Sequence, residues 1–396
     1  MLAFQKIVIL CLACWSLATT AVCGEFSAEL SFETRGYFHK GAHENSDRVD
    51  LSIILQPEYV IAWDEDRKVF TFEPFVRYSS LDKERSHVDI RELSFLGSWE
   101  LIELRVGISK VFWGVTESQH LVDVINQTDF VESPDGEDKL GQPMINIAYV
   151  NEFGNFEIFL LPYFRERTFS GIDGRFRGSP VVNMETASYL SGSGNNHLDA
   201  AFRWSHYIDE LDWALSYFEG TDREPRLYKN ADGTALEPVY GLARQASLEI
   251  QYTVSDWLLK AEVLSKHSDL HGNYWATVTG FEYTFANVHR GMDVGFLYEY
   301  LYDDRKELAG SGLDNATFLG SRVALNDENG FDLLVGSIID HQTGRMNNAF
   351  LESTRRINEN WKWTLESNFL VSPKSGSFLE QVKHDDYLQA SLSFFW

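Results

Sequence analysis

The chain has 396 residues, with 59 acidic and 34 basic side chains and a formal net charge of −25 at pH 7. This acidic balance excludes a nucleic-acid-binding protein, because binding to phosphates needs a basic surface. All three cysteines lie near the amino terminus, so disulfide frameworks and thiolate zinc sites are excluded for the rest of the chain. Aromatic residues make up 14% of the sequence, which, without a long apolar run, is typical of a membrane β-barrel.

Residues 1–24 have the three parts of a secretory signal peptide. A lysine precedes an uncharged apolar run over residues 7–22, and small residues follow it, so we predict cleavage after Cys23 or Gly24. Lipidation of Cys23 is an alternative, but Val22 is a poor small residue to precede a lipidated cysteine. The apolar run is also too short for a comfortable membrane span. The sequence therefore predicts an exported protein without a transmembrane helix.

Beyond this segment, short stretches alternate apolar and polar side chains, as the two faces of barrel strands require. In the first stretch, Phe26, Ala28, Leu30 and Phe32 would face one way and the polar residues between them the other. We expect an all-β, antiparallel, up-and-down transmembrane barrel of about 18 strands, with 16 as the alternative count. A change of phase near Arg91–Glu92 predicts a β-bulge. The expected strands are residues 26–38, 48–63, 68–79, 87–99, 101–112, 143–151, 154–163, 197–207, 210–219, 241–254, 256–267, 273–286, 291–302, 314–326, 331–340, 347–357, 361–371 and 384–396.

Short and long connections alternate between these strands. Tight turns rich in Gly, Asn, Asp or Glu follow the even-numbered strands, and longer loops follow most odd-numbered strands. Because both chain ends of such barrels are periplasmic, the long loops should be extracellular. Many tryptophans fall near strand ends, as interfacial aromatic belts require. The pattern predicts a single barrel domain over residues 25–396.

The carboxyl-terminal residues alternate in the same way and end on Trp396. This ending resembles the terminal strand of bacterial outer-membrane barrels, which closes the barrel and is recognised by the barrel-assembly machinery. The resemblance implies a location in the bacterial outer membrane, with lipid and lipopolysaccharide around the wall. The assembly machinery is then an expected partner, and association into a homo-oligomer is an open alternative to a monomer.

Residues 113–142, the third long connection, carry seven carboxylates and one lysine. They also contain apolar side chains that are unsuited to a free outer loop, so we predict that this segment folds into the lumen. Carboxylates around a pore favour cations, and facing arginines create a transverse field. The residues expected at this constriction are Trp113, Glu117, Asp123, Asn126, Asp129 and Glu132 in the segment, and Arg35, Arg77 and Arg105 on the wall.

The same segment carries a short family resemblance. Trp113-Gly114 at a strand end, followed by Asp-Val-Ile-Asn (123–126) and Asp129, is similar to a stretch in porin-like outer-membrane channels, including the alginate-export type and related uncharacterised barrels. The resemblance implies a channel fold with an inward third loop. Alginate-export channels are expected to have an arginine-rich lumen for a polyanion, and this acidic chain departs from that pattern.

The sequence offers little for catalysis or for a cofactor. Its histidines are scattered over loops and strand ends without a partnered serine. The run Asp135–Asp138 lacks the ligand spacing of a calcium loop, so no cofactor and no metal are expected. We predict a porin-like channel, not an enzyme, that passes small polar or charged solutes by diffusion. The alternative is a non-conducting barrel with a structural or assembly role among envelope components.

Overall fold

The computed structural model describes residues 24–42, 47–306, 313–373 and 378–396. The predicted signal peptide, residues 1–24, lies outside these residues except for Gly24, which begins the first strand. Within the described part of the chain, no helix is both long and apolar enough to cross a membrane.

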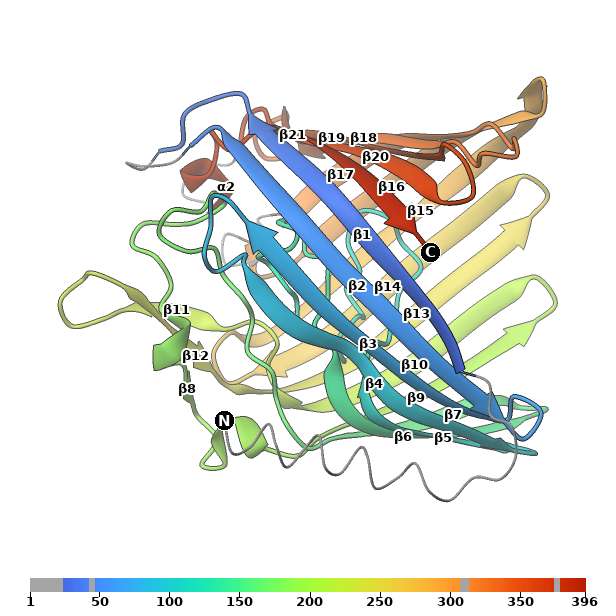
Figure 1. The fold of residues 1–396 in the computed structure, drawn as a ribbon. Coiled ribbons are helices and arrows are strands. Elements are labelled where there is room, and N and C mark those ends of the chain that lie inside the picture. Colours follow the sequence, from blue (N-terminus) through green and yellow to red (C-terminus); the bar gives the residue numbers. More distant parts are fainter. Residues whose placement is uncertain (1–23, 43–46, 307–312, 374–377) are drawn as a thin grey trace.

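The described residues form eighteen antiparallel strands that pair in chain order (Figure 1). Residues 29–37 of the first strand pair with residues 387–395 of the last, so the sheet closes on itself and leaves no unpaired edge. The predicted 18-stranded barrel is confirmed, and the alternative of 16 strands is wrong. The barrel strands are β1 (Gly24–Tyr37), β2 (Val49–Trp63), β3 (Lys68–Ser79), β4 (His87–Trp99), β5 (Ile102–Ser109), β6 (Gln142–Asn151), β7 (Gly154–Leu161), β9 (Asp199–Ile208), β10 (Leu211–Thr221), β13 (Leu242–Val254), β14 (Trp257–Ser268), β15 (Gly272–His289), β16 (Met292–Asp303), β17 (Asn315–Ala324), β18 (Asp332–Asp340), β19 (Arg345–Arg356), β20 (Trp361–Leu370) and β21 (Tyr387–Phe395).

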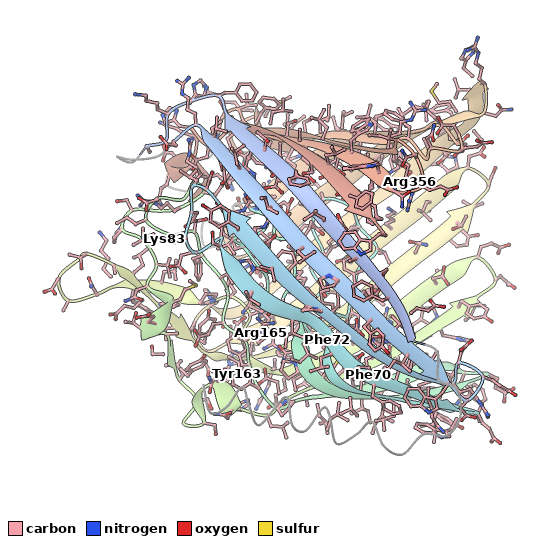
Figure 2. All side chains as sticks on the ribbon, viewed as in Figure 1. Phe70, Phe72, Lys83, Tyr163, Arg165 and Arg356 are labelled. Atoms are coloured by element: carbon pink, nitrogen blue, oxygen red, sulfur yellow. The ribbon has the colours of Figure 1, made fainter. Side chains whose placement is uncertain are left out.

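The strands expose their apolar face and bury their polar face. On β1, Phe32 is 46% exposed on the outer surface, whereas the neighbouring Glu33 and Arg35 are about nineteen-twentieths buried inside. Phe70 and Phe72 on β3 lie on the same outer surface (Figure 2). This arrangement reverses that of a soluble protein, and it follows from the period of two along each strand. An apolar outer band around a polar interior suits a wall that contacts hydrocarbon.

The predicted tight turns contain residues in the left-handed region. Asp64, Glu100, Asp209 and Ser255 have φ values of 59°, 46°, 51° and 54°. Glu100, Asp209 and Ser255 each begin a two-residue hairpin turn, which requires positive φ because its twist must match that of the strands. Asp64 begins a four-residue turn between β2 and β3. These turns lie at the end of the barrel opposite the long loops, as the alternation of connection lengths predicts (Figure 1).

A β-bulge interrupts the pairing of β3 with β4. Glu73 lies opposite Glu92, and Pro74 lies opposite Ile90, so Arg91 is the extra residue. Pro74 lacks an N–H and is tolerated where the ladder is already irregular. The predicted change of phase is confirmed, and it turns the Arg91 side chain into the barrel, where it is 4% exposed.

The long loops carry further secondary structure at one end of the barrel (Figure 1). Two of them share a three-stranded sheet in which β12 pairs with both β11 and β8. The sequence predicts long connections over residues 164–196 and 220–240, but it does not predict this small sheet, because the pairing joins two separate loops. The additional elements are β8 (Ser188–Tyr189), β11 (Arg226–Lys229), β12 (Leu236–Tyr240), two 3-10 turns (Met184–Thr186 and Gly194–Asn196) and the short helix α2 (Phe378–Gln381).

Candidate functional site

The connection between β5 and β6, residues 110–141, is named the inner loop here. It has turns and a single isolated bridge, between Thr128 and Lys139, but no strand or helix. It contains all of the segment predicted to fold inward except Gln142, the first residue of β6. Its contacts are with inward-facing side chains from both sides of the barrel, so it crosses the interior.

Three glutamates on the far wall hold the start of the inner loop. Glu262 on β14 accepts hydrogen bonds from the N–H groups of Val115 and Thr116, at 2.7 and 3.0 Å. Glu299 on β16 accepts from the N–H groups of residues 117 and 118, at 2.7 and 2.8 Å. Glu249 on β13 accepts from the Gly114 N–H at 3.2 Å. Backbone N–H groups of an irregular segment need such partners when they are buried.

Apolar side chains of the inner loop pack against the wall beside these contacts. Val122 and Ile125 are fully buried, and Trp113 is 2% exposed, in a cluster with Phe159 and Phe218 from β7 and β10. Burying a side chain of this size stabilises by about 1.5–3 kcal/mol. These apolar residues of the inner loop, which predicted that it would not extend freely into solvent, therefore help to attach it to the wall.

Ion pairs hold the second half of the inner loop to the near wall. Asp129 lies 2.7 Å from Arg91 on β4, and Glu132 lies 2.7 Å from Arg77 on β3. All four side chains are at most 6% exposed. Removing one partner of such a buried pair costs about 3–5 kcal/mol, because the other charge is left uncompensated. These pairs therefore fix the loop's position.

Two outer loops close over this half of the barrel. Arg85, between β3 and β4, pairs with Glu33 and Asp50 at 2.8 Å each and donates to the Val131 carbonyl of the inner loop at 3.1 Å. From the loop after β7, Arg165 pairs with Asp89 of β4 at 2.8 Å. The mouth of the barrel above β1–β4 is thus filled by an ion-pair network.

Most of the predicted constriction residues lie within these contacts. Trp113 and Asn126 are 2% exposed, and the side chains of Asp123 and Asp129 are fully buried. Asn126 accepts a hydrogen bond from the Val111 N–H and donates to the carbonyls of residues 109 and 140. These residues hold the loop in place, and their side chains do not face open space.

The remaining predicted residues are not brought to one place. Arg77 and Glu132 meet in the ion pair described above. Arg35 on β1 is buried and donates to Gln389 of β21 at 2.6 Å, and Arg105 on β5 donates to Ser109 of its own strand. Glu117 is 22% exposed and pairs with Arg322 of β17 at 2.7 Å.

The open side of the inner loop is acidic. Asp135, Glu137 and Asp138 are its exposed carboxylates. On the opposite wall, Glu352 and Glu366 lie directly across from each other on β19 and β20, and Glu352 interacts electrostatically with Asp135 and Glu137. Glu137 also lies 3.1 Å from Nε2 of His120, and the other carboxylates of this group have no arginine or lysine partner within ion-pair distance among the described residues, so negative charge gathers between the inner loop and β19–β20.

Three carboxyl groups of the inner loop, those of Asp123, Asp135 and Asp138, have pKa values that burial raises. Burial raises the pKa of Asp123 to about 6, although Lys139 at 3.4 Å opposes the shift. Desolvation by the surrounding barrel, with repulsion from Glu132 and Asp135, raises the pKa of Asp138 to about 7, although its side chain still borders open space.

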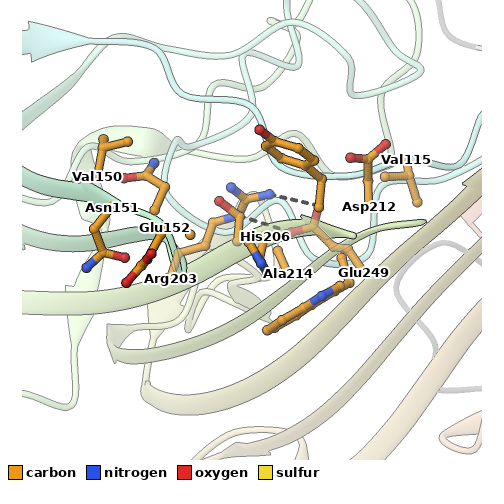
Figure 3. A pocket seen from close by; sticks show the side chains of 14 residues that line it. Val115, Val150, Asn151, Glu152, Arg203, His206, Asp212, Ala214 and Glu249 are labelled. Carbon is orange, nitrogen blue, oxygen red and sulfur yellow. Dashed lines mark hydrogen bonds and ion pairs between the residues drawn. The ribbon is translucent and has the colours of Figure 1, made fainter. Parts of the chain in front are cut away.

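A cavity of about 440 Å³ lies below the inner loop, near the short turns (Figure 3). Val115 of the inner loop lines it from one side, and Arg203 of β9 and Glu249 of β13 line it from the wall. These two wall residues pair at 3.3 Å. The cavity therefore lies on the turn side of the loop, with this ion pair at its edge.

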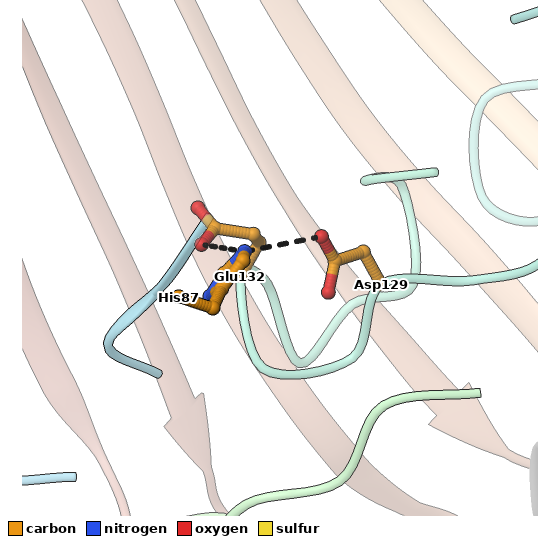
Figure 4. A group of neighbouring side chains, drawn as sticks. All are labelled: His87, Asp129 and Glu132. Carbon is orange, nitrogen blue, oxygen red and sulfur yellow. Dashed lines mark ion pairs between the residues drawn. The ribbon is translucent and has the colours of Figure 1, made fainter. Parts of the chain in front are cut away.

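Several residues that hold this site were not among the predicted ones. The period of two places Glu249, Glu262 and Glu299 at inward positions of their strands, but it does not indicate that they hold the inner loop. Arg85 and Arg165 lie in irregular loops and have no such signal. One group of possible metal ligands also lies at the loop–wall contact (Figure 4), although the sequence predicts none.

Comparison with known proteins supports the fold. No protein-family model and no curated protein matches the chain. Among solved structures, OpdQ of Pseudomonas aeruginosa is 11% identical, with 94% of this chain and 98% of that chain covered and a TM-score of 0.50. OprB of Pseudomonas putida is 14% identical, with coverages of 94% and 93% and a TM-score of 0.46. At this identity the likeness concerns architecture alone. The chain is a closed, 18-stranded antiparallel barrel of the porin-like fold.

Proposed function

We propose that the protein is an outer-membrane channel through which small polar solutes diffuse, with the inner loop as its constriction. The observation that carries this proposal is the attachment of the inner loop to both sides of the barrel. Glu262 and Glu299 hold its start on the far wall, and Arg77 and Arg91 hold its second half on the near wall. A loop fixed in this way narrows the lumen by a set amount.

The apolar outer surface of the strands supports a membrane location. Lipid and lipopolysaccharide would cover this surface, and the assembly machinery would recognise β21. That strand closes the barrel beside β1, where Trp396 and Ala28 exchange two backbone hydrogen bonds of 3.2 and 3.1 Å. Strands that satisfy every backbone group in this way are suited to hydrocarbon.

The charge of the open interior favours cations. Asp135 and Glu137 interact electrostatically with Glu352 on the opposite wall, and carboxylates around a narrow path concentrate cations and repel anions. The buried acids of the inner loop are paired with arginine or lysine, so they contribute less to this field. We therefore assign selectivity to residues 135–138 and the opposite wall.

Single-channel recording in planar bilayers tests the proposal. The purified, folded protein should produce discrete conductance steps, and its reversal potential in a salt gradient should show cation preference. A folded protein that never conducts would favour the second candidate, a structural or assembly barrel. The dense network of the outer loops over β1–β4 is the observation that favours this candidate.

A further inference from the structure

Three side chains with metal-binding groups meet where the inner loop contacts the near wall. His87 begins β4, and Asp129 and Glu132 belong to the inner loop (Figure 4). Nε2 of His87 lies 3.5 Å from Oε1 of Glu132 and 3.9 Å from Oδ2 of Asp129. We propose that these residues form a binding site for a divalent transition-metal ion of the zinc class, which joins the inner loop to the wall.

The His87 ring is held in the orientation that metal binding needs. Its Nδ1 lies 3.1 Å from the carbonyl oxygen of Arg85. Because a carbonyl can only accept, Nδ1 carries the hydrogen, and Nε2 of the neutral ring has a free lone pair. Metal-binding histidines commonly donate their other ring N–H to a backbone carbonyl in this way.

The lone pair of His87 then faces two carboxylates, which is unfavourable unless a cation lies between them. Oε1 of Glu132 and Nε2 of His87 are both buried and have no hydrogen-bond partner, and the Glu132 side chain is 5% exposed. Such buried, unpaired polar atoms cost free energy. Both atoms are directed at the space shared with Asp129.

The separations between Nε2 of His87 and the two carboxylates suit a shared metal ion better than a direct hydrogen bond. A charge-assisted N–H···O bond is about 2.7–2.9 Å long, whereas the two separations from His87 are 3.5 and 3.9 Å. Two ligand atoms that each lie about 2.1 Å from a tetrahedral ion are about 3.4 Å apart. One imidazole and two carboxylates are also a ligand set that zinc accepts.

Neighbouring arginines orient the carboxylates without occupying the site. Arg77 binds the other oxygen of Glu132 at 2.7 Å and also pairs with Glu33 at 3.0 Å. Arg91 lies 2.7 Å from Oδ2 of Asp129, but a carboxylate oxygen has a second lone pair for a metal. Since the arginines are shared with further carboxylates, the group keeps negative charge to attract a cation.

An ion can reach this site from the lumen, because the His87 side chain is 21% exposed. The bound ion would connect residues 129 and 132 of the inner loop to the wall. A ligand that binds the folded chain alone stabilises it in proportion to the logarithm of its concentration. Zinc should therefore raise the unfolding temperature of the barrel.

Calorimetric titration of Zn²⁺ into the chelator-treated, folded chain in detergent tests the site. We expect one Zn²⁺ per chain, with binding weakened at least about tenfold in both His87→Gln and Glu132→Gln. His289→Gln, at the exposed end of β15, is the matched control and should bind as the wild type does. The unfolding temperature with and without Zn²⁺ gives a second readout.

No saturable Zn²⁺ uptake by the wild-type chain overturns the proposal, as does equal affinity in the wild type and both variants. If His87→Gln does not fold, Glu132→Gln carries the test, because its amide oxygen still accepts from Arg77. Binding is measured without conductance, so failure of the metal site is distinguishable from failure of the channel.

Discussion

Glu262 of β14 and Thr116 of the inner loop are joined by two hydrogen bonds to one carboxylate oxygen. Oε1 of Glu262 lies 3.0 Å from the Thr116 N–H and 2.7 Å from its hydroxyl. The same oxygen accepts from the Val115 N–H, and Oε2 accepts from the Val122 N–H at 3.3 Å. One fully buried side chain of the wall thus satisfies two stretches of the inner loop.

Replacing Glu262 should therefore loosen the inner loop. In Glu262→Gln the amide N–H₂ replaces one acceptor, and the charge that strengthens all four bonds is lost. We expect the free energy of unfolding to fall by about 1.5–3 kcal/mol and the open-channel current to fluctuate more. Denaturant unfolding followed by tryptophan fluorescence and single-channel recording measure these effects. Glu282→Gln, which removes a carboxylate 3.7 Å from Lys260 on the same wall, is the control. An equal loss of unfolding free energy in both variants would contradict the role of Glu262 in holding the inner loop.

Cation selectivity should depend on the exposed acids of the inner loop and not on its buried ones. Neutralising Asp135, Glu137 and Asp138 together should reduce the cation-to-anion permeability ratio at least about fivefold, since even one nearby charge in water contributes about 1 kcal/mol. Asp129→Asn should change the ratio less, because its carboxylate is buried against Arg91. Reversal potentials in a salt gradient give the ratio, and Asp232→Asn in an outer loop is the control. A larger change of the permeability ratio in Asp129→Asn than in the triple variant would show that the buried acids, and not the exposed ones, set the selectivity.

The selectivity should also change with pH near neutrality. The pKa of Asp138 is raised to about 7, so its carboxyl is mostly neutral at pH 5.5 and mostly ionised at pH 8.5. Cation preference should therefore rise as the pH increases through about 7. Asp138→Asn should reduce this step, whereas Asp232→Asn should retain it in full. A step of the same size in both variants would show that another group titrates.

Stability should change with pH through Asp123. Its pKa in the folded chain is about 6, above the value of about 3.9 expected in an unfolded chain. The folded chain then binds the proton more tightly, so this stabilising contribution is complete below pH 4 and is lost as the pH rises to about 6. Asp123→Asn should flatten the pH dependence of the unfolding midpoint over that range. An unchanged slope would place the titration elsewhere.

Local features of the sequence were sufficient to predict the strands. The period of two assigned Phe32 to the outside and Glu33 to the inside, and turn residues such as Asp64 and Ser255 marked where strands end. The phase change at Arg91 marked the bulge, because a bulge leaves a local trace in the alternation. These signals depend on neighbours along the chain, so no knowledge of distant contacts was needed.

The inner loop was only partly predictable. Its apolar residues, including Val122 and Ile125, indicated burial, but the sequence could not say which carboxylates would remain exposed. Asp123 and Asp129 were expected at the constriction, but their side chains are buried, and the exposed acids lie within residues 135–138. The difference arises because Arg91 and Lys139 bind the first two acids, and such pairings are set by three-dimensional proximity.

The sequence by itself determined a barrel of about eighteen strands, with an apolar exterior, a polar interior and an acidic third connection, and the pairing of β1 with β21 settled the count. Those properties follow from side-chain alternation and turn chemistry, which act over a few residues. The tertiary structure decided that residues 113–142 rest on Glu262 and Glu299 on one side and on Arg77 and Arg91 on the other. It also decided that His87 meets Asp129 and Glu132. These contacts join residues 38 to 182 positions apart, and only closure of the barrel and the depth of the loop inside it bring them together.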